Sequence, residues 1–141
     1  MITGISHITL IVRNLDAASD FLREIFGAKE VYASEEKQFS LYREKFFLVN
    51  DIWICLMEGE SLSERTYNHI AFSIADSDFE SYVSRIQAAG VEIKPARPRV
   101  EGEGRSIYFY DFDNHLFELH TGTLEERLER YSKNDMLTPC R

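Results

Sequence analysis

The feature that most constrains the fold is an internal repeat. Residues 6–12 read Ser-His-Ile-Thr-Leu-Ile-Val and residues 68–74 read Asn-His-Ile-Ala-Phe-Ser-Ile, so the His-Ile pair recurs after 62 residues. Each segment alternates as a half-buried strand does, and is followed by an apolar stripe of helical spacing that ends at Gly27 or Gly90. Because self-similarity at a fixed distance marks one structural unit written twice, the sequence predicts two β-α-β-β-β modules.

The two predicted modules cover residues 4–58 and 67–121 of a single domain, 1–141. Further strands are expected at about 39–41, 46–49 and 52–57 in the first module, and at 91–94, 106–110 and 116–120 in the second. A capping box at residues 123–126 (Thr-Leu-Glu-Glu) predicts a C-terminal helix over 123–132, and the aperiodic residues after it predict a loose tail. The expected fold class is α+β, with paired βαβββ modules forming a cupped mixed sheet and helices on its outer face.

Composition and charge exclude several classes of function. Asp and Glu number 24 against 16 Lys and Arg, a net charge of −8, which argues against a nucleic-acid groove or a polybasic membrane anchor. No apolar run approaches the roughly 20 residues of a membrane span, and no secretion signal is visible. The two cysteines, Cys55 and Cys140, do not make a disulfide framework, so we expect a cytoplasmic protein.

Strand alternation gives every predicted strand an apolar face and a second face that carries polar groups. The second faces together collect His7, Thr9, Cys55, His69, Ser106, Tyr108 and Glu118. Two histidines and a carboxylate from three strands make a facial triad for a divalent metal, so His7, His69 and Glu118 are the candidate ligands. The repeat places Cys55 at a fourth position, where a thiol ligand would favour zinc; we interpret Cys55 instead as a wall beside an open coordination position.

Four segments, 4–9, 53–55, 67–71 and 101–120, resemble the fosfomycin resistance proteins of the vicinal oxygen chelate superfamily. The similarity runs from about Ile2 to Tyr131. Residues 43–48 (Arg-Glu-Lys-Phe-Phe-Leu) are similar to the water-adding FosX type rather than to the thiol transferases. The loop 97–105 differs from the serine-rich loop of the potassium-dependent thiol transferases, which argues against a potassium site.

The resemblance implies a Mn²⁺-dependent epoxide hydrolase that converts fosfomycin to a vicinal diol and needs no thiol cosubstrate. His7, His69 and Glu118 would hold the metal, and Glu44 would be the general base. Thr9 would assist the opening oxygen or orient the substrate. The resemblance also implies a homodimer, in which paired modules from different chains form each site.

The phosphonate of fosfomycin needs cationic groups and hydrogen-bond donors. By resemblance, Arg127 holds the phosphonate and Tyr67 is a polar contact. In the loop, Arg97 is favoured over Arg99 and Arg105. Four residues of the cavity face complete the predicted substrate site: Ser106 and Tyr108 as donors, Trp53 as an apolar wall, and Cys55 beside it.

Other functions remain open from the residues alone. A thiol transferase of the same family would need a thiol for turnover. A glyoxalase would have an acidic residue at the position of Cys55. A ring-cleaving dioxygenase would have an apolar site that binds an aromatic substrate. A metal-free, drug-binding resistance protein would contain no metal.

Overall fold

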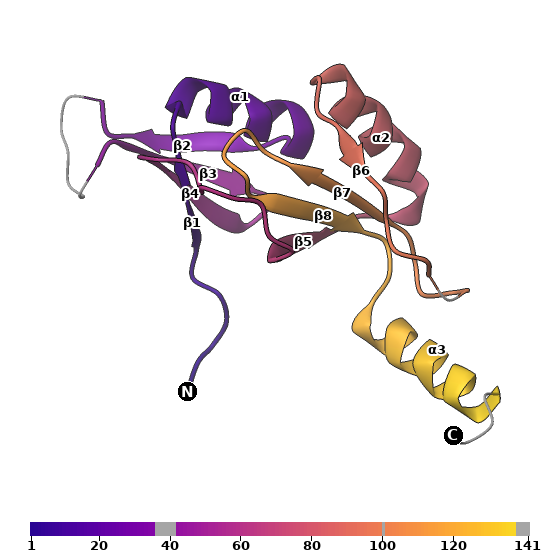
Figure 1. Ribbon diagram of the computed structural model, residues 1–141. Helices are drawn as coiled ribbons and strands as arrows, with labels where there is room; N and C mark the ends of the chain where they lie inside the picture. The colour runs from indigo at the N-terminus through magenta and orange to yellow at the C-terminus, as the bar shows by residue number, and fades with distance from the viewer. Residues whose placement is uncertain (36–41, 100, 138–141) are drawn as a thin grey trace.

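Two four-stranded sheets with the same strand order form the frame of the protein. The computed structural model describes residues 1–35, 42–99 and 101–137 (Figure 1). The first module contains β1 (Ile8–Val12), α1 (Leu15–Phe26), β2 (Lys29–Ala33), β3 (Glu44–Val49) and β4 (Ile52–Glu58). The second contains β5 (His69–Ser73), the 3-10 turn η1 (Asp76–Asp78), α2 (Phe79–Ala88), β6 (Ile93–Lys94), β7 (Ser106–Tyr110) and β8 (Leu116–His120). Helix α3 (Leu124–Leu137) follows.

The strand register preserves the repeat seen in the sequence. The sheet orders are β1-β4-β3-β2 and β5-β8-β7-β6, and in each sheet the first two strands are parallel and the others antiparallel. Thr9 lies opposite Cys55 in the first sheet, as Ala71 lies opposite Glu118 in the second. The predicted α+β fold with paired βαβββ modules is therefore confirmed.

Element boundaries differ from the prediction in several places, including β3, which begins at Glu44 rather than at residue 46. Strand β2, at 29–33, was missed because its sequence, Lys-Glu-Val-Tyr-Ala, is mixed and only partly buried at a sheet edge. The strand predicted at 39–41 lies outside the described residues. Strand β6 is shorter than predicted, and α3 continues five residues beyond 132, so it takes up part of the expected tail; residues 138–141 are outside the description.

Helix α1 joins the two modules through aromatic packing. Phe21 and Phe26 contact Phe109 and Phe117 of the second sheet at ring-centroid distances of 5.3–6.0 Å. Full burial of a phenylalanine contributes about 1.5–3 kcal/mol, so this cluster stabilises the relative placement of the modules. The helix begins where the Asn14 side chain accepts a hydrogen bond from the Ala17 amide.

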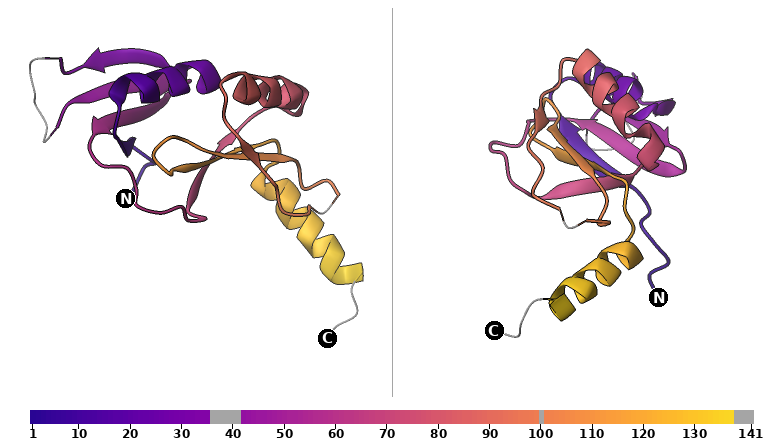
Figure 2. Two further views of the ribbon diagram at one scale, coloured as in Figure 1. Left: turned by 45° about the horizontal axis from the view of Figure 1, so that its top comes forward. Right: turned by 90° about the vertical axis from the view of Figure 1, so that its right-hand side faces the viewer.

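The helices α1 and α2 lie on one side of the sheets, whereas α3 and the N-terminal arm extend from the other side (Figures 1 and 2). The apolar strand faces meet the helices as predicted, because Leu10, Ile54, Phe72 and Leu119 all belong to the buried core. The polar faces therefore look away from α1 and α2. Within the described part of the chain, no helix is long and apolar enough to cross a membrane.

Candidate active site

His69 and Glu118 form the centre of one polar face, on the adjacent parallel strands β5 and β8. His69 Nε2 lies 3.0 Å from Glu118 Oε1, and His69 Nδ1 lies 2.7 Å from the Tyr67 carbonyl oxygen. Because a carbonyl oxygen only accepts, Nδ1 carries the proton, and in the neutral ring Nε2 keeps a lone pair that faces the carboxylate. Two lone-pair donors directed at one point suit a divalent cation.

Glu118 is held as an anion by its neighbours. The side chain is buried, and burial opposes ionisation, but hydrogen bonds from Ser106 and Tyr108 outweigh burial and lower the pKa of the carboxyl group. Ser106 Oγ donates to Glu118 Oε2 over 2.6 Å. The carboxylate is therefore ready to bind a cation at neutral pH.

A hydrogen-bond chain connects Glu118 to α3 through His120. Since Ser106 Oγ donates its proton to Glu118, His120 Nδ1 must donate to Ser106 Oγ, over 2.7 Å. His120 Nε2 then accepts from Arg127 Nη2 over 3.3 Å. Burial lowers the pKa of His120, which keeps the ring neutral and suited to this relay.

The loop arginines have separate positions. Arg99 Nη2 lies 2.9 Å from the Tyr108 hydroxyl and 3.5 Å from Glu118 Oε2, so Arg99 is the loop cation that reaches the predicted ligand Glu118. Arg97, which the sequence favoured, binds Glu103 instead. Arg105 binds Asp76, away from this face. The role of Arg97 in substrate binding stays a prediction.

Tyr67 and Tyr108 border the same face. The Tyr67 hydroxyl donates to the Tyr108 hydroxyl over 3.4 Å, and its ring lies 4.9 Å from that of His69. Burial raises the pKa of Tyr108, and the hydrogen bonds with Tyr67 and Glu118 add to the shift, so the phenol stays protonated. The Tyr67 proton is thus directed at Tyr108 and the Tyr108 proton at Glu118, so the two hydroxyls extend the hydrogen-bond chain around this carboxylate.

The polar face of the first sheet carries Glu44, Cys55 and Thr9. The Cys55 thiol donates to Glu44 Oε2 over 3.5 Å, and the Thr9 hydroxyl hydrogen-bonds to the same sulfur. Burial and then the Glu44 charge raise the pKa of Cys55 to about 11. Cys55 is thus a neutral thiol at physiological pH. A neutral thiol suits the predicted role as part of the cavity wall better than a role as a metal-binding thiolate.

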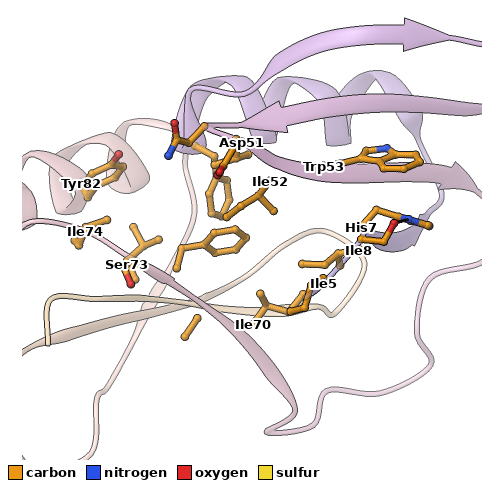
Figure 3. A pocket seen from close by; sticks show the side chains of 17 residues that line it. Ile5, His7, Ile8, Asp51, Ile52, Trp53, Ile70, Ser73, Ile74 and Tyr82 are labelled. Carbon is orange, nitrogen blue, oxygen red and sulfur yellow. Dashed lines mark hydrogen bonds between the residues drawn. The ribbon is translucent and has the colours of Figure 1, made fainter. Parts of the chain in front are cut away.

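His7 and Trp53 lie together at one end of a cavity of about 520 Å³ (Figure 3). Their ring centroids are 4.2 Å apart, and Trp53 Nε1 is buried with no hydrogen-bond partner among the described residues. The cavity walls also include Ile5, Ile8, Ile70 and Tyr82. Neither His69 nor Glu118 lines this cavity.

Two half-sites are therefore present on one chain. We call His7, Thr9, Glu44, Trp53 and Cys55 the first half-site, and Tyr67, His69, Arg99, Ser106, Tyr108, Glu118 and Arg127 the second. Among residues 1–35, 42–99 and 101–137, no group of three metal-binding side chains lies close enough to hold one ion. The single chain does not bring the predicted ligand His7 to His69 and Glu118.

The two half-sites use equivalent strand positions, because Glu44 has the same position in the first sheet that Ser106 has in the second. Glu44 lies opposite Met57, and Ser106 lies opposite His120. Glu44 contacts Cys55 as Ser106 contacts Glu118. The repeat offset of 62 residues from Glu44 to Ser106 was a signal that could have placed Glu44 on the polar face without any resemblance.

A family model described as the Glyoxalase/Bleomycin resistance protein/Dioxygenase superfamily matches residues 4–119. The chain is 67% identical over 131 residues to the fosfomycin resistance protein FosX of Listeria monocytogenes, covering 93% of this chain and 98% of that protein. The chain belongs to this superfamily and, within it, to the FosX-type fosfomycin resistance proteins. A crystal structure of a FosX variant from Listeria monocytogenes, complexed with Mn(II) and 1S,2S-dihydroxypropylphosphonic acid, is similar with a TM-score of 0.85 and 62% identity, covering 93% of this chain and 99% of that one.

Identity to the metallothiol transferase FosB of Shouchella clausii is lower, 39% over 144 residues, covering 97% of this chain and 94% of that protein. The FosX-type assignment thus matches the interpretation of residues 43–48. The sequence analysis ranked Arg99 behind Arg97, and it did not assign a role to His120 or Glu103 in the predicted site. Glu103 is fully buried and binds Arg97, Arg99 and Arg127. The sequence feature that could have indicated a buried Glu103 is the Gly-Glu-Gly segment 102–104, because flanking glycines let the backbone approach its neighbours closely.

Proposed function

We propose that the protein is a Mn(II)-dependent epoxide hydrolase, which adds water to the oxirane of fosfomycin and so confers resistance. The observation that carries this proposal is Glu44, a buried carboxylate on the polar face of the first sheet. Fosfomycin is an epoxypropylphosphonate, and addition of water gives a dihydroxypropylphosphonate, the compound bound to the FosX variant of Listeria monocytogenes. The relative therefore supports water, rather than a thiol, as the nucleophile.

The donor set fits the metal. His7, His69 and Glu118 supply two imidazoles and one carboxylate, which suit Mn(II) and leave positions for other ligands. A bound Mn(II) would supply Lewis acidity for opening the epoxide. The Tyr67 carbonyl fixes the His69 tautomer, and Ser106 holds Glu118 ionised, so these neighbours prepare both ligands.

Glu44 is the proposed base that takes a proton from the attacking water. Such a base contributes about 10²- to 10⁴-fold to the rate. Cys55 donates a hydrogen bond to one carboxylate oxygen and thereby orients the group. Thr9, which contacts the same thiol, is the proposed donor that orients the substrate or assists the opening oxygen.

The phosphonate is proposed to lie against the second half-site. Arg99 and Arg127 present guanidinium groups there, and the hydroxyls of Ser106, Tyr108 and Tyr67, which are predicted substrate contacts, lie beside them and would have to turn from their present acceptors to donate to the phosphonate. Charge-assisted hydrogen bonds of this kind suit a phosphonate dianion. Trp53, with an unpartnered indole N–H among the described residues, is proposed as the opposite wall.

A homodimer is proposed to complete each site. The first half-site holds the proposed base and one metal ligand, whereas the second holds two metal ligands and the phosphonate donors. If the first half-site of one copy faces the second half-site of its partner, each dimer has two complete sites. Exposed apolar side chains on the N-terminal arm (Ile2, Ile5) and on α3 (Leu124, Leu128) provide surface for such an association.

Phosphorus NMR tests the reaction directly. Fosfomycin is incubated with the protein and Mn(II), with and without glutathione, and the phosphonate signals are followed. We expect the diol signal to appear at the same rate in both samples. Product only in the presence of thiol would instead identify a thiol transferase, and binding without product would identify a drug-binding protein.

A further inference from the structure

Glu103 is a buried carboxylate at the centre of a cluster of cations. Its side chain has no exposed surface, and Oε1 lies 3.3 Å from Arg99 Nη1 and 3.6 Å from Arg127 Nε. Arg97 Nη2 also binds this oxygen, and the Tyr131 hydroxyl donates to it over 2.9 Å. One carboxylate thus connects the loop 97–105 to helix α3.

Glycines bring the backbone close around Glu103. Gly102 and Gly104 have φ angles of 80° and 95°, which side chains rarely adopt. A Cβ at Gly104 would lie 2.7 Å from the Gly122 amide nitrogen, and a Cβ at Gly122 would meet the Glu103 carbonyl oxygen. The glycines on either side of Glu103 therefore allow the close backbone packing that places this carboxylate inside the protein.

Arg99 and Arg127 use separate nitrogens for Glu103 and for the second half-site. Arg99 binds Glu103 through Nη1 and directs Nη2 to Ser106 and Tyr108. Arg127 lies near Glu103 through Nε and directs Nη2 to His120. Because a guanidinium is planar and rigid, holding one nitrogen fixes the direction of the others.

The charge balance suits an anion. Three guanidinium groups within a few ångströms repel one another strongly, and a buried carboxylate reduces that repulsion. Arg97, Arg99 and Arg127 bind Glu103, and Arg99 also lies 3.5 Å from Glu118, so three cations meet two carboxylates and one positive charge remains. A phosphonate carries charge of the opposite sign, and a cation bound at Glu118 would add to the attraction.

We infer that Glu103 is a positioning residue, which orients Arg99 and Arg127 toward the second half-site and so determines the affinity for the phosphonate. This inference rests on the proposed function for its substrate, but the anion affinity that it predicts can be measured without turnover. A purely structural role would predict lower stability with no selective effect on anion binding.

The test compares Glu103→Gln with the wild-type dimer at saturating Mn(II). We expect the KM for fosfomycin to rise about 10- to 100-fold, which is the usual effect of removing a residue that orients a binding group. We expect kcat to stay within about threefold of the wild-type value. The Kd for inorganic phosphate, measured by calorimetry, should rise by the same factor. Glu103→Asp retains the charge and should recover part of the loss.

Asp113→Asn is the matched control. Asp113 is a buried carboxylate that accepts from the Arg13 amide over 2.9 Å and from Ser61, and these contacts lie outside both half-sites. This variant should lower Tm and leave KM and the phosphate Kd unchanged. An equal rise in KM for Asp113→Asn would overturn the inference, because KM would then report on stability.

The inference is also overturned if Glu103→Gln folds with KM and phosphate Kd within about twofold of wild type, or if kcat falls while KM is kept. If Glu103→Gln does not fold, Glu103→Asp decides instead. Its shorter side chain displaces the carboxylate, so KM and the phosphate Kd should both rise more than twofold, and values within twofold of wild type would overturn the inference. If the wild type binds phosphate but does not hydrate fosfomycin, the proposed function fails, and the phosphate measurements alone decide on Glu103.

Discussion

Three buried glutamates differ in what surrounds their carboxylates. Glu118 faces His69 Nε2, Glu44 accepts from the Cys55 thiol, and Glu103 binds arginines. A buried carboxylate is costly without partners, so each partner set indicates what the group can do. These surroundings support a metal ligand, a base and a positioning group, respectively.

Glu44→Gln tests the proposed base. Glutamine retains the shape and a hydrogen-bond acceptor for Cys55, but it cannot take a proton at neutral pH. We expect hydration of fosfomycin to fall by about 10²- to 10⁴-fold, while Mn(II) binding, followed by electron paramagnetic resonance, is unchanged.

Glu58→Gln is the control for this change, because Glu58 is an exposed carboxylate at the end of β4 that forms a surface ion pair with Arg43. Its rate should equal that of the wild type. A normal hydration rate in Glu44→Gln would show that another group is the base.

Cys55 gives a pH-dependent readout of the Glu44 charge. Because Cys55 is buried and closed to reagents, its ionisation is followed by the 13C NMR shift of its labelled Cβ, which should have a midpoint near pH 11 rather than at the ordinary thiol value of about 8.5. The Glu44 carboxylate raises the pKa of Cys55, and its neutralisation in Glu44→Gln should therefore move the midpoint to lower pH. Both proteins carry Cys140→Ser, so that a single cysteine signal is followed; an unchanged midpoint would contradict the contact between Glu44 and Cys55.

At the scale of elements, α1 depends on its caps and on its aromatic face. Asn14 accepts from the Ala17 amide over 3.0 Å, and Gly27 ends the helix at a φ of 63°. Asn14→Ala should lower the free energy of unfolding by about 1 kcal/mol, measured by urea denaturation. Glu24→Ala, at an exposed position of the same helix, should change it by less than about 0.5 kcal/mol. Equal effects of the two substitutions would show that the cap is not the cause.

Prediction of the elements succeeded where the pattern was local and strong. The strands that carry Thr9, His69 and Glu118 alternate cleanly, so their polar and apolar faces were correctly assigned. The edge strand β2 has no such pattern, because an edge exposed to solvent tolerates polar residues on both faces. The length of α3 was also underestimated, since its amphipathic signal is weak beyond Tyr131.

At the scale of the whole molecule, the proposed dimer combines the first half-site of one chain with the second half-site of its partner. Mixing inactive variants tests this arrangement. His7→Ala removes a proposed ligand from the first half-site, and Glu118→Gln removes one from the second, so each homodimer should be inactive. If each site combines both chains, equal mixing after dissociation should restore about a quarter of the wild-type activity, because half of the dimers are mixed and each has one intact site.

The same mixture distinguishes the alternatives. Sites formed within one chain would give no recovery, because each chain then carries its own defect. As a control, His7→Ala mixed with Glu44→Gln should stay inactive under either arrangement, since both changes lie in the first half-site. Recovery in that control would contradict the definition of the half-sites.

The sequence by itself determined the repeat and the face of each strand, and its resemblance to the fosfomycin resistance proteins supplied the residues of the proposed metal and phosphonate site. The repeat and the strand faces follow from local rules, because alternation and helical spacing are properties of neighbouring residues along the chain. Only the tertiary structure decided that His7 lies apart from His69 and Glu118, that Arg99 rather than Arg97 reaches Glu118, and that Glu103 is the centre of the arginine cluster. The physical reason is that these placements depend on packing between distant segments, above all α1 against the second sheet and the loop 97–105 against α3, where the contacts join residues far apart in the sequence.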